Sequence, residues 1–169
     1  MWTKKSFQNL KIISSKDSLT KHLSQFGNLE IKLISSRIKR ISKPEIEIYG
    51  QGSKKNNFYV RDVLIGFKDT PLIYARTISK IQNSKKLIYM LKKLSSKSLG
   101  HMLFNNHYSR SDFEYSKPKN ITFLKKLFIN YDHHLNDIKI IRLSFFNLKK
   151  DKILLFEAFF NDINNYEYE

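Results

Sequence analysis

Residues 58–80 read FYVRDVLIGFKDTPLIYARTISK. Two apolar, strand-like runs flank the short polar segment KDTP, a pattern that predicts an antiparallel β-hairpin. Each run also contains one arginine, Arg61 in the first and Arg76 in the second. If the turn is centred between Lys68 and Asp69, the two arginines face each other directly across the hairpin. A register shifted by one residue would separate them.

Two arginines opposite one another require a negative partner. Like charges that face each other destabilise a strand pair, and a half-buried pair persists only beside an opposite charge. A bound carboxylate matches the two-pronged guanidinium well. Alternatively, each arginine forms a salt bridge with a local acid such as Asp62 or Glu114, or extends its head group to the surface. The hairpin therefore indicates an anion site or structural ion pairs.

The rest of the chain indicates an α+β fold. Apolar spacing and turn residues predict further strands that neighbour one another along the chain, and helices between them. We expect helices over 14–27 and 83–94, and a short helix after Ser98. We expect strands that start at 29 and that cover 44–48, 108–116, 138–146 and 152–160. The last two strands form a closing hairpin. Residues 117–137 give no clear pattern. The arrangement predicts an antiparallel sheet of about six strands with helices packed on it.

Length and composition favour one domain. The 169 residues are 41% hydrophobic, enough for a packed core, and with 5 Gly and 3 Pro no flexible linker divides them. We therefore expect a single domain over 1–169 with a core over about 15–161. The absence of cysteine excludes disulfides and thiol chemistry. No apolar stretch is long enough to span a membrane, and the first residues lack the apolar segment of a secretory signal.

The charge of the chain favours an anionic partner. With 31 Lys+Arg against 15 Asp+Glu, the formal net charge is +16, which suits nucleic acid, acidic lipid or an anionic metabolite. The basic residues are spread along the chain, and the segments SSRIKRISK and FLKKLF carry no RNA-binding signature. We expect only weak, salt-sensitive binding to polyanions. The neighbouring His133 and His134 lack the spacing of metal ligands, so we expect no metal site there.

Two further features suit a buried anion site. The segment SSKSLGHML places a helix start near Ser98, Leu99 and Gly100, where free backbone N–H groups can bind an anion, although an ordinary capped helix explains it equally. Glu157 shares a strand face with apolar residues, so its carboxyl should be paired or have a raised pKa. Arg142 lies opposite Glu157 if the turn of the closing hairpin is centred between Lys149 and Lys150.

Five segments, in the same order, resemble the chorismate lyase (chorismate–pyruvate lyase) family, particularly the chorismate-lyase-like proteins encoded on algal plastid genomes. They are DSLTKHLSQFG, the hairpin at 58–79, LKKLSSKSLGHMLF, YSRSDFEY and LLFEAFF. The resemblance implies an antiparallel sheet that encloses a ligand under helical flaps. It also implies the release of pyruvate from chorismate to leave 4-hydroxybenzoate, without metal or organic cofactor. We expect a monomer in the plastid stroma or, alternatively, in the cytoplasm.

The resemblance also implies roles for individual residues. Arg61 would bind the ring carboxylate together with the backbone amide of Leu99. Glu157 would hold the para oxygen, at the end of the molecule from which pyruvate departs, and Leu19 would lie near that end. Arg76 would be a second cation, for the enolpyruvyl carboxylate or for access. A protonated Glu157 could act as general acid on the leaving ether oxygen or could simply orient it.

Two other functions fit the same sequence. A non-catalytic domain that binds a small aromatic acid, as in the ligand-sensing domains of certain bacterial transcription regulators, would keep the pocket without turnover; a diverged enzyme copy would do the same. A basic nucleic-acid-binding protein is the third reading. Pyruvate release from chorismate distinguishes the enzyme from both.

Overall fold

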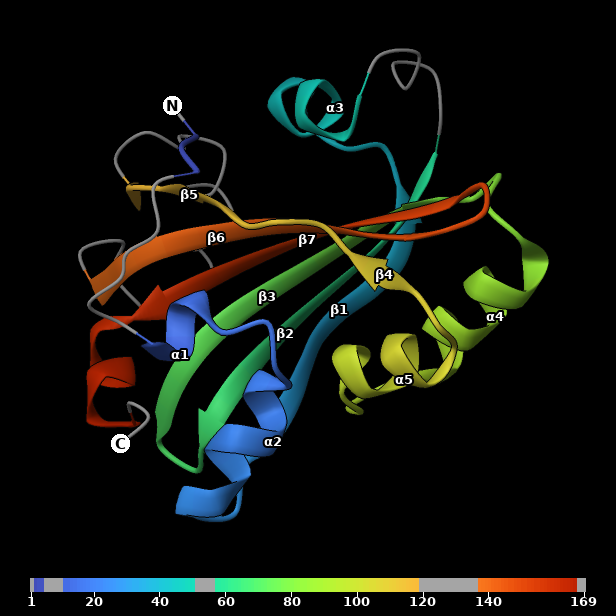
Figure 1. The fold of residues 1–169 in the computed structure, drawn as a ribbon. Coiled ribbons are helices and arrows are strands. Elements are labelled where there is room, and N and C mark those ends of the chain that lie inside the picture. Colours follow the sequence, from blue (N-terminus) through green and yellow to red (C-terminus); the bar gives the residue numbers. More distant parts are fainter. Residues whose placement is uncertain (1, 5–10, 51–56, 119–136, 167–169) are drawn as a thin grey trace.

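A computed structural model describes residues 2–4, 11–50, 57–118 and 137–166 of the chain (Figure 1). Its strands are β1 (Glu30–Lys39), β2 (Phe58–Phe67), β3 (Thr70–Lys80), β4 (Ser109–Arg110), β5 (Glu114–Ser116), β6 (Ile138–Leu148) and β7 (Asp151–Phe160). Its α-helices are α1 (Lys11–Ser14), α2 (Leu19–Leu23), α3 (Lys43–Tyr49), α4 (Lys85–Lys93) and α5 (Leu99–Asn105).

The strands form one antiparallel sheet in the order β1-β2-β3-β7-β6-β4, and β5 also pairs with β6. The predicted α+β class is therefore confirmed. The sheet has seven strands because the segment predicted as one strand over 108–116 forms two short ones, β4 and β5. The closing hairpin has the expected register, with Arg142 opposite Glu157.

The two faces of the sheet are covered differently. Helices α1, α2, α4 and α5 lie over one face, and α3 lies over the other (Figure 1). The larger core includes apolar side chains of the first four helices and of the central strands, such as Leu23, Leu91 and Leu103 against Val63. A smaller core joins α3 to the opposite face of β2 and β7. Within the described ranges no helix is long and apolar enough to cross a membrane.

The register of the β2–β3 hairpin corrects the first expectation. The turn lies where predicted, since Phe67 pairs with Thr70. A bulge between Ile65 and Gly66 then shifts the ladder by one residue, so that Arg61 pairs with Thr77 instead of Arg76. Because successive side chains of a strand point to opposite faces, this shift places the two arginines on opposite sides of the sheet.

Gly66 explains why the bulge lies at this point. A Cβ atom on this residue would lie 2.2 Å from the carbonyl oxygen of Thr70 and 2.8 Å from the Cα atom of Pro71. Both contacts are with backbone, which cannot move aside without opening the hairpin. Only glycine permits this close approach.

Helix α3 replaces the strand predicted over 44–48. Its start carries a capping arrangement in which the Glu45 carboxylate accepts hydrogen bonds from the amide and the hydroxyl of Ser42, both at 2.7 Å. Pro44 in the first turn favours the same helix. The alternating Ile46 and Ile48 imitate a strand, but the helix start decides the structure.

Two other segments differ from expectation or remain untested. The helix predicted over 14–27 is shorter: α2 is followed by a 3₁₀ turn, Ser24–Phe26, and ends at Gly27 with φ 156°. Nearly all of the segment 117–137, with His133 and His134, lies outside the described residues.

The substitution Gly66→Ala tests the bulge. We expect it to lower the free energy of unfolding by about 2 kcal/mol or more, because the new methyl group must displace hairpin backbone. Gly100→Ala is the matched control, because the added Cβ would meet nothing closer than 3.8 Å within a helix, where alanine is favoured. Urea unfolding of both variants gives the comparison. Equal stabilities would contradict the role given to Gly66.

Candidate functional site

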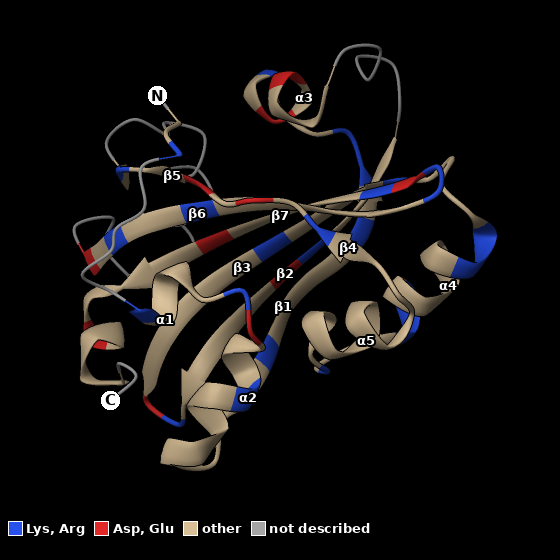
Figure 2. Ribbon diagram, viewed as in Figure 1, with Lys and Arg blue, Asp and Glu red and all other residues tan. Residues whose placement is uncertain are grey.

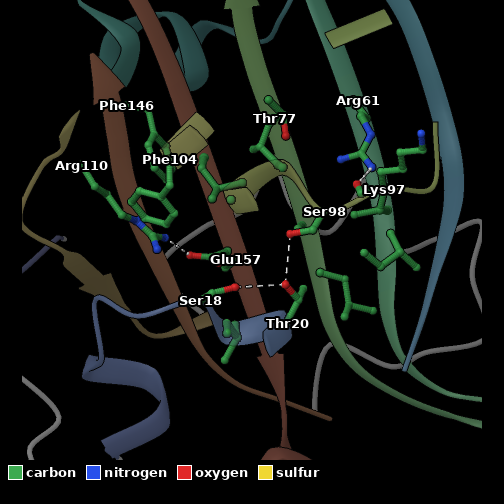
Figure 3. A pocket seen from close by; sticks show the side chains of 18 of the residues that line it. Ser18, Thr20, Arg61, Thr77, Lys97, Ser98, Phe104, Arg110, Phe146 and Glu157 are labelled. Carbon is green, nitrogen blue, oxygen red and sulfur yellow. Dashed lines mark hydrogen bonds and ion pairs between the residues drawn. The ribbon is translucent and has the colours of Figure 1, made fainter. Parts of the chain in front are cut away.

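A buried cavity of about 60 Å³ lies between the sheet and the N-terminal ends of α2 and α5 (Figure 3). That volume is several times what one water molecule needs. Strands β1, β2, β3, β6 and β7 form its floor, and the two helices form its roof. The lining residues are Asp17, Ser18, Leu19, Thr20, Ile31, Arg61, Val63, Ile65, Ala75, Thr77, Lys97, Ser98, Leu99, Gly100, Phe104, Arg110, Phe146, Leu155 and Glu157.

Arg61 supplies a buried positive charge at one end of the cavity. Its side chain is 2% exposed, and its guanidinium donates only to backbone carbonyls: to Ser95 O at 3.1 and 2.7 Å and to Lys97 O at 2.9 Å. Among the described residues it has no carboxylate in contact. Burial lowers the pKa of Arg61 to about 10, so the group is still charged at neutral pH. A buried cation without a counter-ion is costly, and a bound anion would remove that cost.

The roof joins two helix starts. Ser18 caps α2 and Ser98 caps α5, and each side chain accepts a hydrogen bond from the backbone of its own helix. Thr20 links them, since its hydroxyl lies 3.3 Å from the Ser18 hydroxyl and 3.0 Å from the Ser98 hydroxyl (Figure 3). The amides of Leu99 and Gly100, in the first turn of α5, have no acceptor within the helix. Hydrogen-bond donors therefore face the cavity close to Arg61.

Glu157 defines the opposite end. Its carboxylate accepts from Arg142 Nη2 at 3.0 Å on Oε1, and from Arg142 Nε and Arg110 Nη2, both at 2.8 Å, on Oε2. Arg142 is fully buried and also donates to the carbonyl of Ile13 at 2.6 Å. The pairing with Arg142, one of the two alternatives for Glu157, is confirmed.

The charge state of Glu157 follows from these contacts. Burial alone would raise its pKa, but the charges and hydrogen bonds of Arg142 and Arg110 outweigh burial and hold the pKa below the usual value. Glu157 is therefore ionised at neutral pH and can accept hydrogen bonds but not donate one. The hypothesis of a protonated Glu157 acting as general acid is wrong for this structure.

Arg76 lies on the other face of the sheet. It donates to Glu45 at 2.7 Å and to both carboxylate oxygens of Asp62 at 2.8 and 3.0 Å. Tyr74 and Ser35 complete the contacts of Asp62, each at 2.8 Å. This closed network attaches α3 to the sheet, and Arg76 does not line the cavity. The role predicted for it in ligand binding is therefore wrong, and the alternative of a structural ion pair holds.

Four of the five predicted site residues line the same cavity: Leu19, Arg61, Leu99 and Glu157. Sequence reasoning missed Arg110 (Figure 3). Its strand, β4, has only two residues, so no periodic pattern marks which way the side chain points. The one available signal is that the segment at 108–116 places an arginine among aromatic residues.

The charge distribution separates this site from the surface. Figure 2 shows Lys and Arg along α4 and near strand ends, where solvent screens them, and a few charged positions within the central strands. Most of the buried ones belong to the network around Arg76 or to the cavity and the pair of Arg142 with Glu157, whereas Asp151 accepts hydrogen bonds from Ser84 and Tyr108. The fold and site thus define an α+β protein whose cavity is lined by two buried arginines, Arg61 and Arg110.

Comparison with known proteins identifies the family. Residues 5–160 match the family described as chorismate lyase, and the chain therefore belongs to the chorismate lyase family. No curated protein matches the sequence.

A solved structure supports the fold. The possible transcriptional regulator YydK from Bacillus subtilis is similar, with a TM-score of 0.50 and 13% sequence identity over 78% of this chain. The chain spans 57% of the length of that regulator, and at this identity the likeness shows the fold alone.

The ionised state of Glu157 predicts how stability depends on pH. Its folded pKa is depressed, so its contribution is complete above the unfolded value of about 4.3 and is lost as pH falls through the folded pKa. We expect Glu157→Gln to lower stability at pH 7 by about 3 kcal/mol or more, because two buried arginines lose their partner. The variant should also lose less stability than the wild type between pH 5 and pH 3.

The matched control is Asp112→Asn. This substitution breaks the exposed pair between Asp112 and Lys16, whose side chains are 76% and 64% exposed, and should leave stability nearly unchanged. Urea unfolding at several pH values measures both variants. Identical pH profiles for wild type and Glu157→Gln would contradict an ionised Glu157.

Proposed function

We propose that this protein releases pyruvate from chorismate and leaves 4-hydroxybenzoate. The observation that carries the proposal is the buried guanidinium of Arg61, which lines the cavity and contacts no acid among the described residues. Membership of the chorismate lyase family supports the same chemistry. Chorismate has two carboxylates on a small ring system, which suits a compact site with placed cations.

The sheet register supports one orientation of the ligand. Arg61 pairs with Thr77, Thr77 with Leu155, and Glu157 lies two residues further along β7. Strand spacing of about 4.8 Å and a rise of about 3.3 Å per residue place the Cα atoms of Arg61 and Glu157 about 12 Å apart. The two side chains can then contact opposite ends of one substituted ring. In our proposal the ring carboxylate binds Arg61 and the amide of Leu99, and the ring hydroxyl donates to Glu157.

The reaction is an elimination that makes the ring aromatic. The ether bond between the ring and the enolpyruvyl oxygen breaks, and the neighbouring ring carbon, which bears the hydroxyl, loses its hydrogen. The released group gains a proton at its methylene carbon and becomes pyruvate. Because aromatisation drives the reaction, orientation and placed charge are the main contributions that the protein must make.

Glu157 acts in this proposal as an orienting acceptor. Its low pKa makes it a weak base, and its ionised state excludes proton donation. A hydrogen bond from the ring hydroxyl to its carboxylate would fix the ring in the plane between Arg61 and Arg110. Leu19, in the first turn of α2, lines the cavity from the roof.

Purified protein tests the proposal directly. With chorismate, we expect stoichiometric pyruvate and 4-hydroxybenzoate, measured by a coupled dehydrogenase assay and by chromatography. Arg61→Ala should reduce kcat/KM by about 100-fold or more, because the ring carboxylate loses a charge-assisted, two-point contact. Arg61→Lys keeps the charge but loses the fork, so it should recover only part of the activity.

Arg37→Ala is the control for a change of net charge. Arg37 is exposed on β1, the strand that pairs with β2. Its substitution by alanine therefore removes the same charge as Arg61→Ala, but outside the cavity. Its activity should match the wild type. Equal turnover in Arg61→Ala and Arg37→Ala would refute the role of Arg61.

A binding module is the second candidate function. The observation that favours it is the likeness of fold to a possible transcriptional regulator. In that case 4-hydroxybenzoate would bind tightly and chorismate would yield no pyruvate. A plastid location and a monomeric state stay predictions from the sequence resemblance.

A further inference from the structure

Arg110 lines the cavity beside Glu157, yet pairing with Glu157 does not account for its charge (Figure 3). The guanidinium carbon lies 4.6 Å from the centroid of the Phe113 ring and 5.0 Å from that of the Phe146 ring. Its Nε donates to the hydroxyl of Ser144 at 3.0 Å. Two aromatic rings and two hydrogen bonds thus hold the head group in one position.

Glu157 is already neutralised without Arg110. Arg142 contacts both oxygens of the Glu157 carboxylate and lies opposite it in the ladder. Such a two-point pair is the strongest arrangement of these groups. Arg110 therefore adds a second positive charge to a carboxylate that has one complete partner. The group of three carries a net charge of +1.

The surplus charge is buried rather than solvated. The side chain of Arg110 is 8% exposed, and burial lowers its pKa to about 10, which leaves it charged at neutral pH. Among the described residues, Nη1 of Arg110 has no hydrogen-bond acceptor, whereas Nε and Nη2 have one each. Asp17 also lines the cavity, but it is exposed to solvent and bonds to Ser15.

Within the described part of the chain, the cavity therefore has a cation without a complete acidic partner at each end. There, Arg61 has only carbonyl partners, and Arg110 shares a carboxylate that Arg142 already holds. Each surplus charge is costly without an anion. A ligand with one carboxylate can satisfy one end, and a ligand with two can satisfy both.

We propose that Arg110 binds the second carboxylate of a dicarboxylate ligand and so makes the site selective for dianions over monoanions. This inference rests on the proposed function and deepens it, since it gives the enolpyruvyl carboxylate a partner within the cavity. Arg110 takes the role that the sequence suggested for Arg76. After elimination, pyruvate carries this carboxylate away and leaves a monoanionic product whose carboxylate pairs with Arg61 and not with Arg110.

Two unreactive ligands test the inference. They are 4-hydroxybenzoate and its derivative with a carboxymethoxy group at position 3, which differ only in the arm that bears the second carboxylate. Isothermal titration calorimetry on the wild type should show at least about tenfold tighter binding of the dicarboxylate, as expected for one additional charge-assisted contact. A wild type that binds both ligands equally would overturn the proposal without any variant.

Variants assign the preference to Arg110. Arg110→Gln keeps a donor near Glu157 but removes the charge, so it should abolish the preference and change the affinity for 4-hydroxybenzoate by less than about threefold. Arg110→Lys should restore part of the preference. Arg61→Gln should weaken the binding of both ligands by a similar factor.

The alternative is that Arg110 only positions Glu157. In that case Arg110→Gln would weaken the binding of 4-hydroxybenzoate and of the dicarboxylate by the same factor, because both ligands place the same hydroxyl on Glu157. That result would overturn the proposal. Neither measurement uses turnover. A protein that binds dianions selectively but releases no pyruvate from chorismate would therefore contradict the proposed reaction and leave the assignment of Arg110 intact.

Discussion

The one-residue shift at the β2–β3 bulge determines on which face of the sheet each of the two hairpin arginines lies. With glycine at position 66, the Thr70 carbonyl can approach the opposite strand, and the ladder beyond it pairs Arg61 with Thr77. Arg61 then shares a face with Glu157, and Arg76 with Asp62. Without the shift, both arginines would lie on one face and repel each other across the hairpin.

The two faces treat their charges in contrasting ways. On the face that α3 covers, Arg76 donates hydrogen bonds to two carboxylates, those of Glu45 and Asp62. The other contacts of these carboxylates come from hydroxyl and backbone groups, so both the charge of Arg76 and the acceptor oxygens have partners. On the face that holds the cavity, Arg61 contacts no acid among the residues that the structure describes, and Arg110 shares Glu157 with Arg142. A complete network suits a structural role, because nothing is left for a ligand to satisfy. An incomplete network around a cavity suits a binding role.

The state of Glu157 constrains the chemistry of the site. Two arginines keep it ionised despite its burial and hold its pKa low, which is the reverse of the raised pKa that a general acid needs. The site is therefore better suited to holding a charged ligand in a fixed orientation than to transferring protons. A reaction that gains its driving force from aromatisation within the substrate is compatible with such a site, because it depends mainly on how the substrate is held.

The sequence by itself determined the antiparallel α+β class and the central and closing hairpins, because alternation and turn residues are local signals. The resemblance to chorismate lyases implied Leu19, Arg61, Leu99 and Glu157 as site residues, and all four line the cavity. Only the tertiary structure decided that Arg76 is structural and that Arg110 enters the cavity. The reason is physical: one bulge reverses which way a strand's side chains point, and a two-residue strand has no period from which to read its direction.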